Sequence, residues 1–155
     1  MHLTILVGTM TGTAKLVAEE IQLTVEDDIT SVEVKLMDDL GAAEFSRAGP
    51  FLICTSTYGQ GDVPDNAKAL LESLTRERPA LSAVAYGVVA LGDRTYVETF
   101  CFGGKRFDDL MQELGARRIG EVLRHDASAG TLPEEVVLQW IPGWLEQARA
   151  FCRNP

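Results

Sequence analysis

Three polar segments that combine glycine with hydroxyl-bearing or aromatic residues stand out in the sequence. They cover residues 8–14, 56–66 and 92–104. Each follows a run of apolar, β-forming residues, which predicts that each is a loop at the end of a strand. Glycine, threonine and tyrosine in such loops can bind a ligand through backbone groups, hydroxyl groups and ring stacking.

The segment at 8–14, GTMTGTA, has the composition of a phosphate-binding turn. Gly8 and Gly12 permit tight turns without a steric penalty. The helix expected after it would present free backbone N–H groups and the positive end of its dipole to an anion. Neither the dinucleotide pattern GxGxxG nor the P-loop pattern GxxxxGK[ST] is present. A turn in which a threonine only caps the helix is the alternative, and this segment alone does not decide between the two.

The other two segments each place a tyrosine near glycine. Tyr58 directly precedes Gly59, and Tyr96 follows Gly92 and Asp93. A tyrosine can lie flat against a planar ring while a neighbouring glycine lets the backbone approach the ring edge. A surface tyrosine in a flexible loop is the alternative for either residue taken singly. Two tyrosines and a phosphate-binding turn on converging loops describe a pocket for a planar ring that carries a phosphate.

Alternating strands and helices are predicted to position these loops. Apolar, β-forming runs predict strands at 3–7, 31–36, 50–55, 83–91 and 117–123. Apolar residues at helical spacing predict helices around 14–25, 67–74, 107–114 and 137–148. The strand at 31–36 is expected at an edge, and the apolar run at 83–91 is expected in the centre. This alternation predicts an α/β fold with three layers, in which helices cover both faces of a doubly wound, five-stranded parallel sheet. A ligand would lie beyond the carboxyl ends of the strands.

Local signals predict where some helices begin and end. Asp62 or Asp65 is expected to cap the second helix, and Gly115 is expected to end the third. Residues 131–134 have the form of a capping box for the last helix. Pro142 is expected to kink that helix or split it.

Composition sets the class of protein. The 155 residues are enough for a single domain over 1–155, and 46% hydrophobic with 24% charged residues is typical of a globular chain. A net charge of −9 disfavours nucleic acid and anionic membranes as partners and suits a basic protein, although solubility alone would also explain it. No apolar run is long enough to span a membrane, and residues 1–7 do not resemble a signal peptide.

The cysteines and histidines do not indicate a metal site or a disulfide framework. The three cysteines, Cys54, Cys101 and Cys152, form no CxxC pattern, and only His2 and His125 could add imidazole ligands. A reducing cytoplasm is the expected compartment. Cys54 is expected in the core. His125 is expected in a surface loop.

The three loops, in this order, resemble the cofactor-binding loops of the flavodoxins, small electron-transfer proteins that bind flavin mononucleotide (FMN). Residues 9–14 match the phosphate loop [ST]-x-T-G-x-[TA], residues 56–59 resemble the first ring loop, and residues 92–96 with Phe100 and Cys101 resemble the second. The resemblance extends from residue 3 to about residue 145, and it is strongest to short-chain flavodoxins of the MioC type. It implies FMN as the cofactor and the strand order 2-1-3-4-5.

The resemblance also implies roles for individual residues. The first loop would surround the phosphate, and Tyr58 and Tyr96 would sandwich the flavin ring, with Tyr96 on the solvent side. Gly59 would approach N5 of the ring, and its carbonyl is expected to turn toward that atom when the ring is reduced. The expected cofactor-binding residues are Thr9, Met10, Thr11, Gly12, Thr13, Ala14, Ser56, Thr57, Tyr58, Gly59, Leu91, Gly92, Asp93, Tyr96, Phe100 and Cys101.

Three positions depart from the family pattern. Ala14 stands where many flavodoxins have a hydroxyl, and Tyr58 stands where tryptophan is frequent. Residues 97–99 make the second ring loop about one residue longer than is usual in the family. We therefore expect weaker FMN binding than in typical flavodoxins.

The function implied is that of an electron carrier, not an enzyme. It would carry one electron at a time, as a cytoplasmic monomer, between a flavoprotein reductase, for example an NADPH-dependent one, and acceptor enzymes. These partners would dock on an acidic surface near the flavin.

The alternative on the same fold is an FMN-dependent quinone or NAD(P)H oxidoreductase, although the sequence has no second nucleotide motif. A Cys-loop phosphatase is disfavoured because only four residues separate Cys101 from Arg106. A flavin-free regulatory module would need an acidic cluster, which Asp93 alone does not provide.

Overall fold

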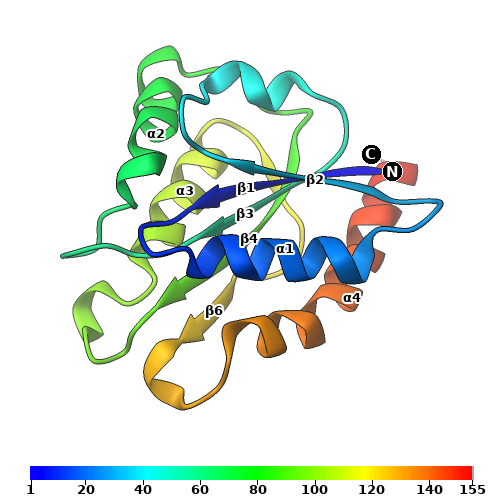
Figure 1. The fold of residues 1–155 in the computed structure, drawn as a ribbon. Helices are drawn as coiled ribbons and strands as arrows, with labels where there is room; N and C mark the ends of the chain where they lie inside the picture. The colour runs from blue at the N-terminus through cyan, green and yellow to red at the C-terminus, as the bar shows by residue number, and fades with distance from the viewer. Residues whose placement is uncertain (155) are drawn as a thin grey trace.

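Six parallel strands form one sheet in the computed structural model, which describes residues 1–154 (Figure 1). Its neighbouring strands follow the order β2-β1-β3-β4-β5, and β6 also pairs with β4. The strands are β1 (His2–Gly8), β2 (Ser31–Leu36), β3 (Phe51–Thr55), β4 (Ala85–Gly92), β5 (Arg117–Arg118) and β6 (Leu123–Asp126). The predicted α/β fold and strand order are therefore confirmed.

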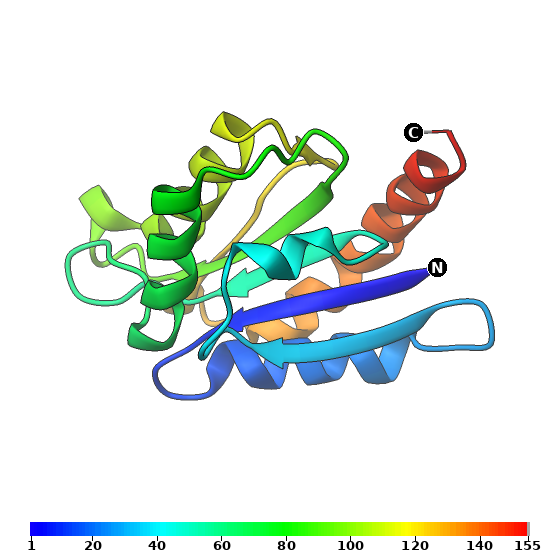
Figure 2. The same cartoon turned by 90° about the horizontal axis from the view of Figure 1, so that it is seen from above.

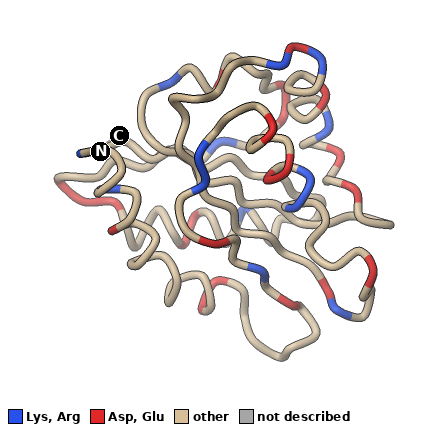
Figure 3. The backbone as a smooth tube through the Cα atoms, turned by 180° about the vertical axis from the view of Figure 1, so that it is seen from behind, with Lys and Arg blue, Asp and Glu red and all other residues tan. Residues whose placement is uncertain are grey.

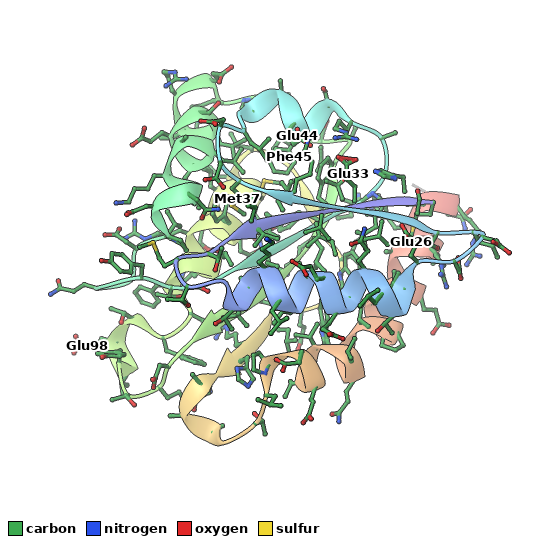
Figure 4. The ribbon with its side chains drawn as sticks, viewed as in Figure 1. Glu26, Glu33, Met37, Glu44, Phe45 and Glu98 are labelled. Carbon is green, nitrogen blue, oxygen red and sulfur yellow. The ribbon has the colours of Figure 1, made fainter. Side chains whose placement is uncertain are left out.

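Four helices cover the two faces of the sheet (Figure 2). They are α1 (Thr13–Val25), α2 (Asp65–Glu77), α3 (Phe102–Glu113) and α4 (Pro133–Arg153). On one face, α1 and α4 bury residues such as Ile21 and Trp144 against the sheet. On the other face, α2, α3 and a short 3-10 helix at Ala42–Ser46 bury a second core that includes Met37 and Phe45 (Figure 4). The α1 residues predicted to face the core are all buried.

The last predicted strand, 117–123, is not continuous. It is replaced by β5 and β6, which pair with different parts of β4. Between them, Gly120 has a φ of +68° and turns the chain. The carbonyl of Ile119 accepts a hydrogen bond of 3.0 Å from the indole nitrogen of Trp144 on α4. This contact takes that carbonyl out of the sheet, which explains why one strand became two.

Two predicted helix caps are wrong. Pro64, not an aspartate, is the residue before α2, and the side chain of Asp65 forms an ion pair of 2.9 Å with Lys68. The residue before α4 is Leu132, and it makes no side-chain cap. Gly115 ends α3 as predicted, with a φ of +95° and its N–H bonded to the carbonyl of Gln112 at 3.0 Å.

The prediction that His125 lies in a surface loop is also wrong. His125 is buried in β6, and its Nε2 lies 3.0 Å from the hydroxyl of Thr131. The expected capping box is absent for the same reason, since Thr131 contacts His125 and not the start of α4.

Pro142 lies inside α4 and does not split it. Ile141, Trp144 and Leu145 are buried on either side of the proline. Packing of these side chains offsets the hydrogen bond that a proline removes from a helix. None of the helices in residues 1–154 is long and apolar enough to cross a bilayer.

Glycines at the start of α3 bring this helix close to the end of the sheet. A β-carbon on Gly104 would lie 2.5 Å from the β-carbon of Ala90, and one on Gly103 would lie 2.4 Å from the carbonyl oxygen of Ser56. Real β-carbons do not tolerate such contacts, so α3 can pack here only with glycine at both positions. This close approach places α3 directly behind the loop that follows β3.

Candidate functional site

A cavity of about 1180 Å³ lies at the carboxyl ends of the strands, between the loops that follow β1, β3 and β4. Glu98, which lines it, lies at that end of the sheet, opposite the end that carries Glu26 (Figure 4). The lining residues are Met10, Thr11, Thr13, Ser56, Thr57, Tyr58, Gly59, Gln60, Leu91, Gly92, Asp93, Tyr96, Val97, Glu98, Thr99 and Ala127. The three segments singled out in the sequence therefore meet around one cavity.

Most residues expected to bind the cofactor line this cavity, and five do not. Those that line it are Met10, Thr11, Thr13, Ser56, Thr57, Tyr58, Gly59, Leu91, Gly92, Asp93 and Tyr96. Those that do not are Thr9, Gly12, Ala14, Phe100 and Cys101. Contact of any of these residues with FMN stays a prediction.

Thr9 and Gly12 shape the first loop from within. The N–H of Gly12, which has a φ of +94°, donates a hydrogen bond of 2.9 Å to the hydroxyl oxygen of Thr9. The N–H of Thr9 donates in turn to the side-chain oxygen of Asn66 at 2.8 Å. These two bonds close the loop into a turn immediately before α1.

The start of α1 is open to an anion. Gly12 precedes the helix without a side-chain cap, and the first turn contains no acidic residue. The N–H groups of a first helical turn have no partner inside the helix, and the helix dipole makes this end positive. Thr11 and Thr13 line the cavity beside these groups and add hydroxyls. The side chain of Ala14 is fully buried in the core, so this residue offers the site only its backbone.

The loop after β3 is a short hairpin. Tyr58 and Asp62 exchange backbone hydrogen bonds of 2.8 and 2.9 Å. Gly59 and Gly61 make the turn between them with φ values of +56° and +94°. Arg106 on α3 donates a hydrogen bond of 2.8 Å to the carbonyl of Gly61. This frame leaves Tyr58 48% exposed at the cavity.

The loop after β4 makes a tight turn that presents Tyr96. The side chain of Asp93 accepts a hydrogen bond of 2.8 Å from the N–H of Thr95, and the backbone carbonyl of Asp93 accepts one of 3.0 Å from the N–H of Tyr96. The Tyr96 side chain is 64% exposed. Below the turn, the guanidinium of Arg94 lies 4.5 Å from the centre of the Phe100 ring. Phe100 therefore supports this loop from outside the cavity.

Asp126 at the end of β6 fixes the same loop from the other side. Its carboxylate accepts a hydrogen bond of 2.9 Å from the N–H of Arg94 and further bonds from Ser128. The bond from Arg94 is the main reason that the pKa of Asp126 is held below its usual value, and the Ser128 hydroxyl adds to the effect. The residue after Asp126, Ala127, lines the cavity.

Cys101 is buried against β4 and does not line the cavity. It has a φ of +58°, precedes α3, and directs its thiol toward the carbonyl of Ala90 at 3.4 Å. Burial raises the pKa of Cys101 to about 11 and that of Cys54 to about 12, so both thiols are protonated at neutral pH. Cys54 is buried in β3, as predicted, whereas Cys152 is exposed.

Sequence reasoning did not assign several residues of the site. Gln60, Val97, Glu98 and Thr99 lie inside the segments that were singled out, so their position next to the tyrosines was a usable signal. The strand before Ala127 was predicted to end at residue 123, whereas β6 ends at Asp126. The sequence pattern therefore gave no reason to place Ala127 at the site.

The residues present fit FMN. The uncapped start of α1 and the hydroxyls beside it match a phosphate, and the two exposed tyrosines border a space that a planar ring can enter. Within residues 1–154, no group of three or more histidine, cysteine or acidic side chains could hold a metal ion. The site is therefore built from hydrogen-bond donors and aromatic rings.

Several known proteins that resemble this chain are flavodoxins. A family model described as flavodoxin matches residues 5–140. The chain is 40% identical over 144 residues to Flavodoxin YqcA from Pectobacterium carotovorum subsp. carotovorum, covering 92% of this chain and 93% of the relative. It is 32% identical over 146 residues to Protein MioC from Escherichia coli (strain K12), with 92% and 95% covered.

A larger protein and a solved structure also resemble this chain. The chain is 35% identical over 146 residues to the flavoprotein alpha-component of NADPH sulfite reductase from Bacillus subtilis (strain 168), covering 94% of this chain but 23% of that protein. A cysteine-to-alanine variant of flavodoxin from Pseudomonas aeruginosa has the same fold, with a TM-score of 0.86, 32% identity, and 96% and 99% of the two chains covered. This chain therefore belongs to the flavodoxins, a family of small FMN-binding proteins that carry electrons.

Proposed function

We propose that residues 1–155 form a single FMN-binding domain that carries one electron at a time between a flavoprotein reductase and acceptor enzymes. The observation that carries this proposal is the meeting of three features in one cavity. These are the uncapped start of α1, the hairpin that presents Tyr58 and the turn that presents Tyr96. FMN supplies the redox chemistry, and the chain binds it and sets its surroundings.

The phosphate would be held by neutral donors. None of the residues that line the cavity is a lysine or an arginine. The first-turn N–H groups of α1, the helix dipole and the hydroxyls of Thr11 and Thr13 are the groups that remain for an anion. The site would thus select a phosphate by the geometry of these donors and by the positive end of the helix dipole, without a cationic side chain.

The ring would lie between Tyr58 and Tyr96, with Gly59 at its edge. Two carboxylates, Asp93 and Glu98, also line the cavity. Negative charges beside a ring that gains negative charge on reduction make that reduction less favourable. We therefore expect the bound flavin to work at a lower potential than free FMN.

Reductase-type proteins are the partners that the comparisons favour, since a sulfite reductase flavoprotein contains a region similar to this chain. The surface on which such a partner would dock is assigned from charge. The chain has 23 acidic and 14 basic residues, and Figure 3 shows basic residues among the acidic ones along the chain. We assign docking to the cavity rim, because Asp93 and Glu98 line the same cavity as the exposed Tyr58 and Tyr96, and expect the partner to be basic there. A cytoplasmic monomer fits this role.

The proposed function is tested by titrating the apoprotein with FMN while recording flavin fluorescence and absorbance. We expect strong quenching and shifted absorption bands, because the tyrosine rings stack on the flavin. Riboflavin, which lacks the phosphate, should bind more weakly. Fluorescence of free flavin at high protein concentration would overturn the proposal.

A second assay separates a carrier from an enzyme. Loaded protein with NADPH and a flavoprotein reductase should be reduced at a rate that falls with ionic strength, because docking between charged surfaces is screened by salt. The comparisons give no support to an FMN-dependent quinone or NAD(P)H oxidoreductase. Reduction of a quinone by NADPH without the added reductase would favour that alternative.

A further inference from the structure

Asn66, the second residue of α2, connects three separate parts of the chain through one side-chain amide. Its oxygen accepts a hydrogen bond of 2.8 Å from the N–H of Thr9. Its nitrogen donates bonds of 3.1 Å to the carbonyl of Val7 and to the carboxylate of Asp38. The residues on either side of Gly8 are thus held by the same group, at the point where β1 ends and the first loop begins.

Only an amide satisfies these three partners together. Thr9 needs an acceptor, whereas Val7 and Asp38 both need a donor, and an asparagine side chain carries one acceptor oxygen and two N–H donors. A carboxylate would turn an acceptor toward the carbonyl of Val7 and the charge of Asp38. An alanine would leave the N–H of Thr9 and the carbonyl of Val7 without partners.

The bond to Thr9 is the first link of a chain that ends at α1. Asn66 holds the N–H of Thr9, and the hydroxyl of Thr9 holds the N–H of Gly12. Gly12 is the residue that precedes α1, and its carbonyl accepts the first hydrogen bond of that helix, from Leu16 at 3.0 Å. The direction in which the open N–H groups of α1 face the cavity therefore depends on where Asn66 holds Thr9.

We propose that Asn66 is a positioning residue that fixes the first loop in a shape ready for a phosphate, and thereby gives the site its preference for FMN over riboflavin. This inference rests on the proposed function, because it assigns the phosphate of FMN to that loop. Asn66 does not line the cavity and acts through Thr9 and Gly12. Binding needs less ordering when a loop already has its bound shape, so the gain goes to the ligand that carries the phosphate.

The test compares the affinities of Asn66→Ala and wild-type apoprotein for FMN and for riboflavin. We expect the FMN dissociation constant to rise about 10- to 100-fold, because two backbone groups of the loop lose their partner. The riboflavin constant should change by less than about threefold. Equal losses for both ligands would overturn the proposal, since Asn66 would then support the whole site and not the phosphate loop. Unchanged FMN binding would also overturn it.

Two further variants keep the test decisive. Asn66→Asp has nearly the same shape, but the carbonyl of Val7 and the carboxylate of Asp38 would repel its carboxylate and displace it from Thr9. It should therefore show the same selective loss even if the alanine variant folds poorly. Gln22→Ala is the matched control. It removes another side-chain amide that bonds a backbone carbonyl, that of Val32 at 2.9 Å, on α1 away from the cavity. It should leave both affinities unchanged.

Amide hydrogen exchange at Thr9 in the apoprotein measures how firmly the first loop is held when no ligand is bound. Exchange should be at least about tenfold faster in Asn66→Ala than in wild type, because the N–H loses its acceptor. Unchanged exchange would overturn the inference. Wild-type protein that binds neither flavin would instead count against the proposed function, and exchange at Thr9 would still decide whether Asn66 holds the loop.

Discussion

The hydroxyl of Thr57 donates a hydrogen bond of 3.0 Å to the carbonyl oxygen of Leu91. It also accepts a bond of 3.1 Å from the N–H of Gly103 at the start of α3. One side chain thus joins the loop after β3, the end of β4 and the helix behind them. The distance between the two tyrosine-bearing loops is set in part by this hydroxyl.

Replacement of Thr57 by valine, which keeps the shape and removes the hydroxyl, should weaken both the fold and the site. A carbonyl and an N–H lose their partner, so we expect the free energy of unfolding to fall by about 1–3 kcal/mol. FMN affinity should also fall, by about tenfold, because the two loops are no longer joined. Urea unfolding and FMN titration measure the two effects.

Thr75→Val is the control for this change. The Thr75 hydroxyl bonds the carbonyl of Leu71 at 2.8 Å on the exposed side of α2. Surface substitutions of this kind change stability by about 0.5 kcal/mol or less. If Thr57→Val lowered the free energy of unfolding by no more than Thr75→Val does, the bond from Thr57 to Leu91 would not stabilise the fold.

Tyr96→Ala should reduce FMN binding without affecting the fold. The side chain is 64% exposed, so its loss should change the free energy of unfolding of the apoprotein by no more than about 0.5 kcal/mol. Stacking of an aromatic side chain on a flat ring contributes about 1–3 kcal/mol, which predicts roughly a 5- to 150-fold loss of affinity. Flavin fluorescence in the complex should rise at the same time. Tyr96→Phe, which keeps the ring, should behave as wild type, and equal losses in both variants would argue against stacking.

The fold was predictable where the signal is local. The strand Ser31–Leu36 has the predicted bounds, and the buried positions of α1 are those of its apolar spacing. Alternation and helical spacing reflect which face of an element is buried, and each can be seen within a few residues. The three loops of the site were found for the same reason, because each follows an apolar strand.

Features that depend on distant contacts were not predictable. The interruption between β5 and β6 depends on Trp144, which is 25 residues from its partner Ile119. The failed capping box depends on a burial of His125 that sequence spacing does not reveal. Asn66 is the clearest case in the site, since its contact Thr9 is 57 residues away. Its type and position alone suggest only a residue in the first turn of a helix.

The stability that the ionised Asp126 carboxylate contributes should be lost only in acid. Hydrogen bonds, first that from the N–H of Arg94, hold the pKa of Asp126 below its usual value. A carboxyl whose pKa is lowered by folding adds stability above its unfolded pKa, which is about 3.9 for aspartate, and loses this contribution as the pH falls through the lower folded value. Wild type should therefore be more stable than Asp126→Asn from pH 7 down to about 4, with the difference shrinking below that.

Thermal unfolding of both proteins between pH 7 and about 2.5 measures this difference. Other carboxyls titrate equally in the two proteins, so their effect cancels in the comparison. A difference that stayed constant over the whole range would show that ionisation of Asp126 does not stabilise the loop. FMN affinity of Asp126→Asn at pH 7 should also be lower, because a neutral amide oxygen accepts the N–H of Arg94, two residues before Tyr96, more weakly than a carboxylate does.

Gly59 is expected to affect the potentials of the flavin through its backbone alone. Its φ is +56°, and a β-carbon at this position meets no atom within 4 Å. Alanine would therefore fit without a clash but would restrict the peptide, at a cost of about 1–2 kcal/mol in left-handed backbone. If the Gly59 carbonyl turns toward the ring on reduction, the turned peptide needs a backbone conformation that alanine adopts less readily than glycine, so Gly59→Ala should lower the potential for the first electron.

Gly130→Ala is the control for the redox titration of Gly59→Ala. Gly130 has a φ of +79°, and a β-carbon there also meets no atom within 4 Å, but the residue does not line the cavity. Both substitutions carry the same backbone cost, so both should lower stability to a similar degree. Only Gly59→Ala should change the potentials in a spectroscopic redox titration. A first-electron potential equal to that of wild type in Gly59→Ala would mean that the peptide does not turn, because alanine would then have had nothing to restrict.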